Sequence, residues 1–414
     1  MAEPLLRRRK GFSRLLAGQG VSALGDWMAT TAFMALTLKL TGSPTAVGGI
    51  LTVRLLPAIV AGPIAARAAH RAGPRPTMLT MDALRVAMVA VVPFVQALWW
   101  VYLWAFMIEV ASLVFLPARD ACVPDLVDEE DLPAANGMLL GSSYGTIPIG
   151  AGAFALVAAL PVERWPVIGD RPYALAFWVD AATYVVSFLL IAGIAELSRA
   201  VPETATDEPP GLRGAFRLPL VRAVLPATLG AALGLGCLFS VGIVFVREVL
   251  DASDAAFGLL IVSFGVGAGL GLLLLQRRGG EPSLAWVREG IGVAALSMGA
   301  IAIAPAIVGA YLAAITLGAG ISHGIVAGMS VLQRDTDGED RLLAFTAFHI
   351  SIRLALGISA LAAGAAGDLV PEMHWPGIGE VAPARTVILG AGAVVLLSLA
   401  AVPRTTPTRS AHST

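Results

Sequence analysis

The sequence predicts an all-α membrane protein with twelve transmembrane helices, arranged as two six-helix halves around a central cavity. Three observations predict it: 57% of the 414 residues are hydrophobic, only 14% are charged, and the mean hydropathy is +0.79. A soluble globular domain carries about 25% charged residues, so this much apolar surface must face lipid. The composition excludes a nucleic-acid-binding protein, a secreted disulfide-stapled domain and a soluble enzyme.

Twelve apolar runs lie between polar, Gly or Pro breaks, and each approaches the roughly 20 residues that a bilayer-crossing helix needs. They are continuous rather than alternating, which favours helices over a β-barrel. They cover residues 14–40, 46–69, 77–99, 102–122, 138–160, 174–195, 219–247, 255–275, 284–304, 307–330, 342–366 and 386–402.

The longest polar break lies near the middle of the chain, at 196–218, and contains Pro202, Asp207 and Glu208. It predicts an N-terminal half over 1–195, a cytoplasmic linker over 196–218, a C-terminal half over 219–402 and a cytoplasmic tail over 403–414. With both termini inside, nineteen of the 28 cations fall on the cytoplasmic side, five outside and four within spans. This bias predicts the orientation of every span.

Charged residues inside a bilayer indicate a structural or functional role, because placing one at mid-bilayer costs at least about 2.5–3.5 kcal/mol of insertion free energy. Asp26 in the first span is the leading candidate for proton coupling or substrate binding, because a desolvated carboxylate can take up a proton near neutral pH. Glu109 in the fourth span could do the same or bind a cationic compound. The alternative for Asp26 is a structural ion pair with Arg54 on the adjacent span.

Other ionisable residues have both a functional and a structural interpretation. Arg353 could attract an anionic substrate group, and His323 with His349 could relay protons or simply pack through hydrogen bonds. Asp82 and Arg85 are three residues apart and can pair on one helical face, whereas Arg288 and Glu289 point to contacts with another helix. These last four lie near the cytoplasmic side, so they are candidates for gate contacts, and together they outline a faint repeat of one half in the other, as in many transporters.

Aromatic residues divide into two groups. Trp99, Trp100 and Trp104 cluster where two spans end, as interfacial aromatic residues do. Trp27, Phe33 and Tyr144 lie deeper and could line an apolar cavity. No residue spacing supports a metal site, and no cofactor motif is present, since the Gly-rich run 265–271 lacks the Lys of a phosphate-binding loop.

Three stretches carry a resemblance to the major facilitator superfamily, and within it to the bacterial drug, macrolide and siderophore exporter branch. They cover nearly the first 150 residues, whereas the second half is similar in layout only. They are Gln19-Gly-Val-Ser-Ala-Leu-Gly-Asp-Trp27 with Leu40-Thr-Gly-Ser-Pro-Thr-Ala-Val-Gly48; Arg54-Leu-Leu-Pro57 through Gly62-Pro63 to His70-Arg-Ala-Gly-Pro-Arg75; and Pro117-Ala-Arg-Asp-Ala-Cys-Val-Pro-Asp-Leu-Val127 continuing to Asn136.

The resemblance also implies particular residues. The family's loop after the second span acts as a gate or conformational switch, which places His70, Arg71, Gly73 and Arg75 in that role, although Ala66 and His70 replace the family's Gly and Asp. A neutral His cannot supply the Asp charge that locks one gate state. The fifth span partly matches the family's antiporter-type helix-packing motif, with Gly141, Gly145, Pro148, Gly150 and Gly152.

The sequence therefore predicts a secondary transporter, not an enzyme, that exports amphipathic or hydrophobic small molecules in exchange for protons by alternating access. The alternatives are a dedicated exporter of a siderophore, metabolite or lipid, and a membrane sensor or scaffold that transports nothing. We expect a monomer in the bacterial cytoplasmic (inner) membrane, with both termini cytoplasmic. Its partners would be a small-molecule substrate, protons and the lipid bilayer, with no nucleic acid, metal or cofactor.

Overall fold

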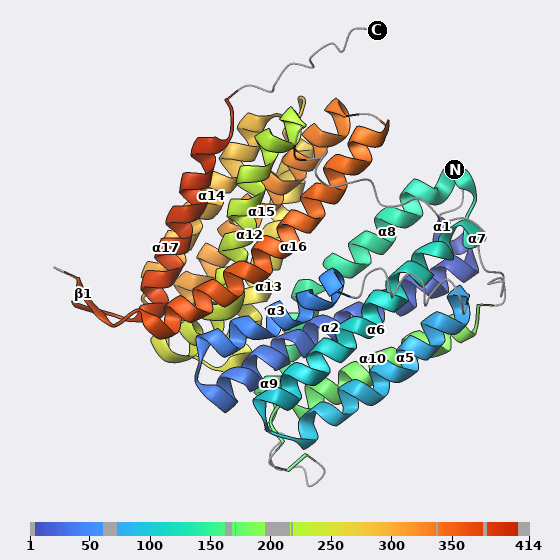
Figure 1. The fold of residues 1–414 in the computed structure, drawn as a ribbon, viewed down its shortest axis with the longest axis horizontal. Helices are drawn as coiled ribbons and strands as arrows, with labels where there is room; N and C mark the ends of the chain where they lie inside the picture. The colour runs from blue at the N-terminus through green and yellow to red at the C-terminus, as the bar shows by residue number, and fades with distance from the viewer. Residues whose placement is uncertain are drawn as a thin grey trace. The chain divides into compact units, whose positions relative to one another are not determined.

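The computed structural model of the protein describes residues 5–60, 73–161, 168–169, 171–194, 216, 218–336, 338–375 and 379–404. Almost all of these residues are helical (Figure 1). The chain forms two compact units, the first made of Met1–Gly42 and Val53–Thr206 and the second of Ser43–Thr52 and Asp207–Thr414. The boundary between the units therefore falls inside one helix, α3 (Pro44–Val60).

The first unit contains the helices that come before the middle of the chain. Its central helix, α2, ends where Gly42 adopts a left-handed conformation (φ 64°) and donates its N–H to Leu38 O at 2.7 Å, a common helix end. The elements are α1 (Leu5–Arg8), α2 (Lys10–Thr41), the end of α3, α5 (Pro74–Val91) with a 3-10 turn at Val92–Phe94, α6 (Leu98–Ala121), α7 (Val123–Leu126), a 3-10 turn at Glu129–Asp131, α8 (Leu132–Tyr144), α9 (Ile147–Ala159) and α10 (Ala174–Ala192).

Packing in the first unit centres on α2, which contacts α8, α9 and α10, while α5 packs against α6 and α10. A buried apolar cluster joins α2, α5, α6 and α8 at one end of the unit through Phe12, Met78, Phe115 and Leu139. At the same end Arg8 pairs with Asp131 and Arg9 with Asp128. The start of the chain is thus tied to the acidic turn before α8.

The second unit contains the later helices and a small antiparallel hairpin. The hairpin pairs Met373 with Val381 and Trp375 with Gly379; the sequence had indicated helices alone. The elements are the start of α3, α12 (Pro219–Val244) with a π turn at Phe245–Val249, α13 (Asp254–Arg277), α14 (Leu284–Ile303), α15 (Ile307–Asp335), α16 (Gly338–Leu369), β1 (Met373–Trp375), β2 (Gly379–Val381), α17 (Pro383–Ser398) and a 3-10 turn at Leu399–Ala401.

The start of α3 packs closely against α16 within the second unit. Any side chain at Gly48 would collide with the backbone of Ala360. Asp368 near the end of α16 accepts hydrogen bonds from the Ser43 hydroxyl at 2.7 Å and from the Thr45 N–H at 3.1 Å. That N–H is one of the unpaired donors of a helix start, so Asp368 caps α3.

The helices confirm the predicted class of fold. Eleven helical segments in the described part of the chain, one of them α8 and α9 taken together, are long and apolar enough to cross a membrane. They coincide with eleven of the twelve predicted spans, apart from shifts of several residues at their ends. The remaining predicted span, 46–69, corresponds to α3, which is described only to Val60. The division into halves with a linker at 196–218 stays a prediction, since nearly all of that linker lies outside the described residues.

Candidate functional site

Asp26 lies in the middle of α2 and is half-buried. The Tyr184 hydroxyl of α10 donates a hydrogen bond to its Oδ1 atom, and Asp26 has no ion-pair partner among the described residues. The preceding residue, Gly25, allows α2 to approach α10 closely, because a Cβ there would collide with the Asp180 and Thr183 side chains. The close approach of two helices thus sets the surroundings of this carboxylate.

Arg85 links Tyr184 to a second carboxylate. It pairs with Asp82 one helical turn earlier on α5, and both side chains are almost fully buried. Its guanidinium also stacks over the Tyr184 ring at 4.3 Å and the Phe115 ring at 4.4 Å. Ser187 donates to the other Asp82 oxygen at 2.8 Å, so the pair predicted from spacing is a buried, hydrogen-bonded network.

Asp180 is a third carboxyl group of this region and is buried on α10. Thr183 donates to its Oδ1 at 3.2 Å, while Oδ2 has no hydrogen-bond partner among the described residues. A buried carboxylate without a cation is costly, and protonation removes that cost. Asp180 is therefore a second carboxyl group able to hold a proton.

Arg54 and Glu109 form an ion pair between α3 and α6, with 3.2 Å from Nη2 to Oε2. The structural alternative predicted an ion pair between Arg54 and Asp26. In the structure the ion-pair partner of Arg54 is Glu109 instead. The Arg54 side chain is 14% exposed and that of Glu109 26% exposed. Among the described intramembrane charges of the first unit, this pair and Asp26 are partly exposed, whereas Asp82, Arg85 and Asp180 are buried.

Sequence reasoning missed Tyr184 and Ser187 and gave no role to Asp180. Their spacing could have indicated a shared site. Three or four residues separate Asp180 from Thr183 and Tyr184, and these from Ser187, so all four share one face of α10. The acid alone was visible as a charge inside a span. The hydroxyl groups were not, since Ser, Thr and Tyr are ordinary residues of membrane helices.

The predicted cavity residues have different surroundings. Phe33 is fully buried and packs edge-on against Phe177 at 4.8 Å between ring centroids, so here it belongs to the core. Trp27 donates its indole N–H to Ser143 O of α8 at 3.1 Å. Tyr144 ends α8, and its side chain lies outside the described residues.

The candidates in the second unit lie on two helices, α15 and α16. The His323 Nε2 atom on α15 is 3.4 Å from an Arg278 nitrogen, and Arg353 is exposed on α16. His349 is also on α16, but its side chain lies outside the described residues. The relay predicted for the two histidines stays a prediction.

The candidate gate residues form contacts within their own units. His70 and Arg71 lie outside the described residues, and Gly73 begins α5 with φ 82°. Arg75 donates to Ala192 O at the end of α10 at 2.6 Å. Arg288 donates to Leu399 O at 2.7 Å and to Val402 O at 2.6 Å, beyond the end of α17. Arginines at these sites satisfy the free carbonyl groups of helix ends.

The predicted packing motif of the fifth span is divided between two helices. The chain breaks at Gly145 and Thr146 between α8 and α9, and Pro148 stands in the first turn of α9, where Pro is well tolerated. Gly150 packs against α2, because a Cβ there would lie 2.6 Å from Leu24 O. Gly141, by contrast, faces open space, and Gly152 lies inside α9.

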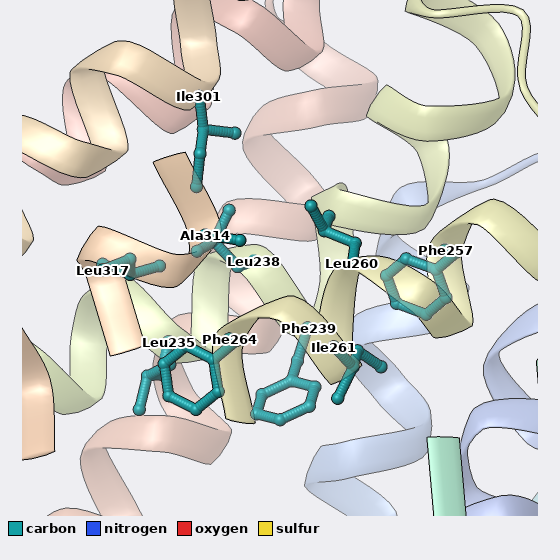
Figure 2. A pocket seen from close by; sticks show the side chains of 10 residues that line it. All are labelled: Leu235, Leu238, Phe239, Phe257, Leu260, Ile261, Phe264, Ile301, Ala314 and Leu317. Atoms are coloured by element: carbon teal, nitrogen blue, oxygen red, sulfur yellow. The ribbon is translucent and has the colours of Figure 1, made fainter. Parts of the chain in front are cut away.

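An apolar pocket lies within the second unit, among α12, α13, α14 and α15. Figure 2 shows its ten lining side chains, which include Phe239, Phe257 and Phe264 and carry no polar group. Its volume of about 50 Å³ is far below the roughly 300–1,000 Å³ of a drug-sized site. Among the described residues, no three His, Cys, Asp or Glu side chains are grouped as a metal ion would require.

Comparison with known proteins gives consistent matches over most of the chain. A family model described as Major Facilitator Superfamily matches residues 15–360. An uncharacterized MFS-type transporter of Bacillus subtilis (strain 168), YfiS, is 30% identical over 181 residues, which span 39% of this chain and 43% of YfiS. A second from the same organism, YvqJ, is 22% identical and aligns over 96% of this chain and 94% of its own length.

Solved transporters share the fold. A bacterial homolog of the human lysosomal transporter Spinster, inward-facing and occupied, gives a TM-score of 0.74 at 15% identity, covering 97% of both chains. A bacterial homologue of the iron transporter ferroportin, inward-facing, gives 0.72 at 15% identity, covering 97% of this chain and 98% of its own. The nucleoside transporter NupG gives 0.70 at 13% identity, covering 95% and 98%.

Proposed function

The chain belongs to the Major Facilitator Superfamily and is a membrane transporter rather than an enzyme, and from this premise we propose that it exports amphipathic or hydrophobic small molecules in exchange for protons. The outward direction rests on the likeness of its first 150 residues to the exporter branch. A dedicated exporter of a siderophore, metabolite or lipid is the alternative within transport.

The position of Asp26 carries the proposal of proton coupling. The carboxylate is half-buried in a predicted span, receives a hydrogen bond from Tyr184, and has no ion-pair partner among the described residues. A charged carboxylate at that depth is costly, and binding a proton removes the charge. Asp26 can therefore take up a proton from one side of the membrane and release it to the other. Asp180, buried beside Gly25, is the natural second acceptor for the proton.

The neighbouring groups suit this exchange. Arg85 is held by Asp82 and stacks on Tyr184, so it fixes the ring whose hydroxyl binds Asp26. The Arg54–Glu109 pair keeps both of its charges balanced. Asp26 is therefore a partly exposed intramembrane carboxylate with no ion-pair partner among the described residues, although the charges of Arg54 and Arg85 lie close enough to act on it. Such a carboxylate suits a site shared by a proton and a cationic substrate.

The test separates proton coupling from substrate movement. Purified protein in proteoliposomes is given a panel of dyes and antibiotics, and two fluxes are measured: counterflow without a pH gradient and accumulation driven by an imposed one. We expect Asp26→Asn to retain counterflow and to lose the gradient-driven accumulation. Glu130→Gln serves as the control, because it removes an exposed carboxylate of the acidic turn before α8 and should leave both fluxes unchanged.

Four results would contradict the proposal. Full gradient-driven accumulation by Asp26→Asn removes the role of Asp26. Loss of both fluxes, with an unchanged unfolding temperature, makes Asp26 a substrate ligand rather than a proton site. No flux of any compound in wild-type protein favours the sensor or scaffold interpretation, and flux restricted to one secreted metabolite favours the dedicated exporter.

A further inference from the structure

A groove lies between two consecutive helices of the second unit. Both α13 and α14 pack chiefly against α15 rather than against each other. Glycines permit both contacts: a Cβ at Gly271 would collide with Ala319 O, and one at Gly290 would lie 2.6 Å from Gly320 O. The helices thus straddle α15 and leave a cavity of about 500 Å³ whose floor is α15.

Charged side chains occupy one end of this groove. Arg278 donates to Glu289 Oε2 at 2.6 Å and lies 3.4 Å from His323 Nε2, while its guanidinium stacks over Trp286 at 4.6 Å. Arg277 also lines the cavity and forms no hydrogen bond or ion pair with a described residue. Two arginines and one glutamate leave a net positive charge, and Arg277 is the cation free to bind a ligand.

The rest of the groove is aliphatic and open to the outside of the unit. Leu274 and Val293 line it and are 61% and 41% exposed. Leu270 is four residues before Leu274 and Leu296 three residues after Val293, so they extend the same two faces, with exposed fractions of 46% and 70%. In a chain that spans a membrane, such surfaces contact acyl chains.

The depth of the groove matches the region of the lipid headgroups. Arg277 is the last residue of α13 and Leu284 the first of α14. Leu274 and Val293 lie three and nine residues inward, or about 5 and 14 Å at 1.5 Å per residue. The two arginines are therefore at the membrane edge, on the side predicted to be cytoplasmic, while Glu289 lies five residues, or about 8 Å, inward from Leu284. The aliphatic surface runs inward from the arginines.

We propose that this groove binds an anionic phospholipid, with its phosphate on Arg277 and Arg278 and its acyl chains along Leu274 and Val293. Basic pockets between helix ends on the cytoplasmic side are suited to anionic lipid headgroups. The occupant is a lipid rather than a soluble phosphate compound because the cavity continues into exposed aliphatic surface. Glu289 opposes the phosphate, and the bond from Arg278 offsets that charge.

Native mass spectrometry of the full chain in detergent tests the proposal, with dioleoyl phosphatidylglycerol, dioleoyl phosphatidylcholine and inorganic phosphate as separate probes. We expect one phosphatidylglycerol to be retained more strongly than phosphatidylcholine. Arg277→Gln and Arg278→Gln should each weaken that retention by roughly fivefold. Arg334→Gln is the matched control, because Arg334 lies at the same end of the unit, pairs with Asp335 and Glu281, and does not line the groove.

Glu289→Gln supplies a test of opposite sign. Removing this carboxylate frees Arg278, so retention of phosphatidylglycerol should rise, whereas damage to the fold would lower it. Equal retention of the two lipids, unchanged retention in the double variant Arg277→Gln/Arg278→Gln, or complete displacement of lipid by an equal concentration of inorganic phosphate would each overturn the proposal.

Discussion

Asp82 and Arg85 form the most deeply buried ion pair of the described chain. Each charge is compensated by the other, so removing one leaves an unpaired buried charge. Asp82→Asn leaves the guanidinium uncompensated, which should cost about 3–5 kcal/mol of stability. The double variant Asp82→Asn/Arg85→Met removes both charges and should recover a substantial part of that loss. Thermal unfolding in detergent, followed by tryptophan fluorescence, measures both values.

An exposed pair gives the contrast. Asp128→Asn breaks the pair with Arg9, where both side chains are at least 35% exposed, and should cost at most about 1 kcal/mol. Equal losses for Asp82→Asn and Asp128→Asn would show that burial does not determine the strength of these pairs.

Cys122 lies just beyond α6, is 1% exposed, and should resist thiol reagents. Burial, with smaller contributions from Asp125 and Asp120, raises the pKa of its thiol to about 12. The reactive species is the thiolate, so at pH 8 only about one molecule in ten thousand presents it. The fraction increases as pH rises toward the pKa. Maleimide labelling of folded protein should therefore be negligible at pH 8 and faster at higher pH.

A nearby exposed position shows that the reagent reaches this side of the chain. Glu130 is exposed in the acidic turn before α8, so a Glu130→Cys variant should label rapidly at pH 8. Rapid labelling of wild-type protein at pH 8 would instead mean that the α6–α8 connection opens frequently.

The sequence predicted the acids of the site better than their partners. Asp26, Arg54 and Glu109 stood out because a charge in an apolar run is rare. Which carboxylate Arg54 would pair with depended on how three helices lie in space, and the structure selects Glu109 over Asp26. The Tyr184 contact could not be foreseen, since 158 residues separate it from Asp26.

At the scale of helices, two glycines of one predicted motif should respond oppositely to the same change. Gly150→Ala places a methyl group 2.6 Å from Leu24 O and 2.7 Å from Trp27 Cβ, and such overpacking costs about 1–3 kcal/mol. Gly141→Ala meets nothing within 4 Å and should stabilise its helix by up to about 1 kcal/mol. The unfolding temperatures of the two variants measure this, and a shift in the same direction for both would contradict the assignment of α9 as the packing helix.

Spans were easier to predict than the interruptions between and within them. Long apolar runs predict α13 to within two residues and α6 to within four at each end, because the bilayer sets both length and composition. The break at Gly145–Thr146 and the hairpin at Met373–Val381 depend on local turn geometry and on neighbouring packing. Neither leaves a periodic signal in the sequence.

At the scale of the molecule, the same contact recurs in both units. Arg75 in the first turn of α5, just before the third predicted span, binds the carbonyl at the end of the sixth, and Arg288 on the ninth binds carbonyls at the end of the twelfth. This pattern agrees with two related halves. By this contact Arg288 in the second unit corresponds to Arg75 in the first. The sequence pattern alone had matched Arg288 with the pair Asp82 and Arg85.

The distribution of cations predicts that both ends of the chain are cytoplasmic. A green fluorescent protein fused after Thr414 should therefore fluoresce, and alkaline phosphatase at the same point should be inactive. Fusions within 162–167, predicted to be outside, should give the reverse. An active C-terminal phosphatase would contradict the predicted orientation.

The position of Ser43–Thr52 has a consequence for dividing this protein into fragments. These ten residues precede most of the first unit along the chain, yet they complete the second. A fragment that begins at Asp207 would lack the helical segment that covers Ala360 and would leave Asp368 with no helix to cap. If the two halves are synthesised separately, residues 43–52 of the N-terminal fragment must dock onto the C-terminal fragment. The two fragments should therefore form a working protein only when both are made in the same cell.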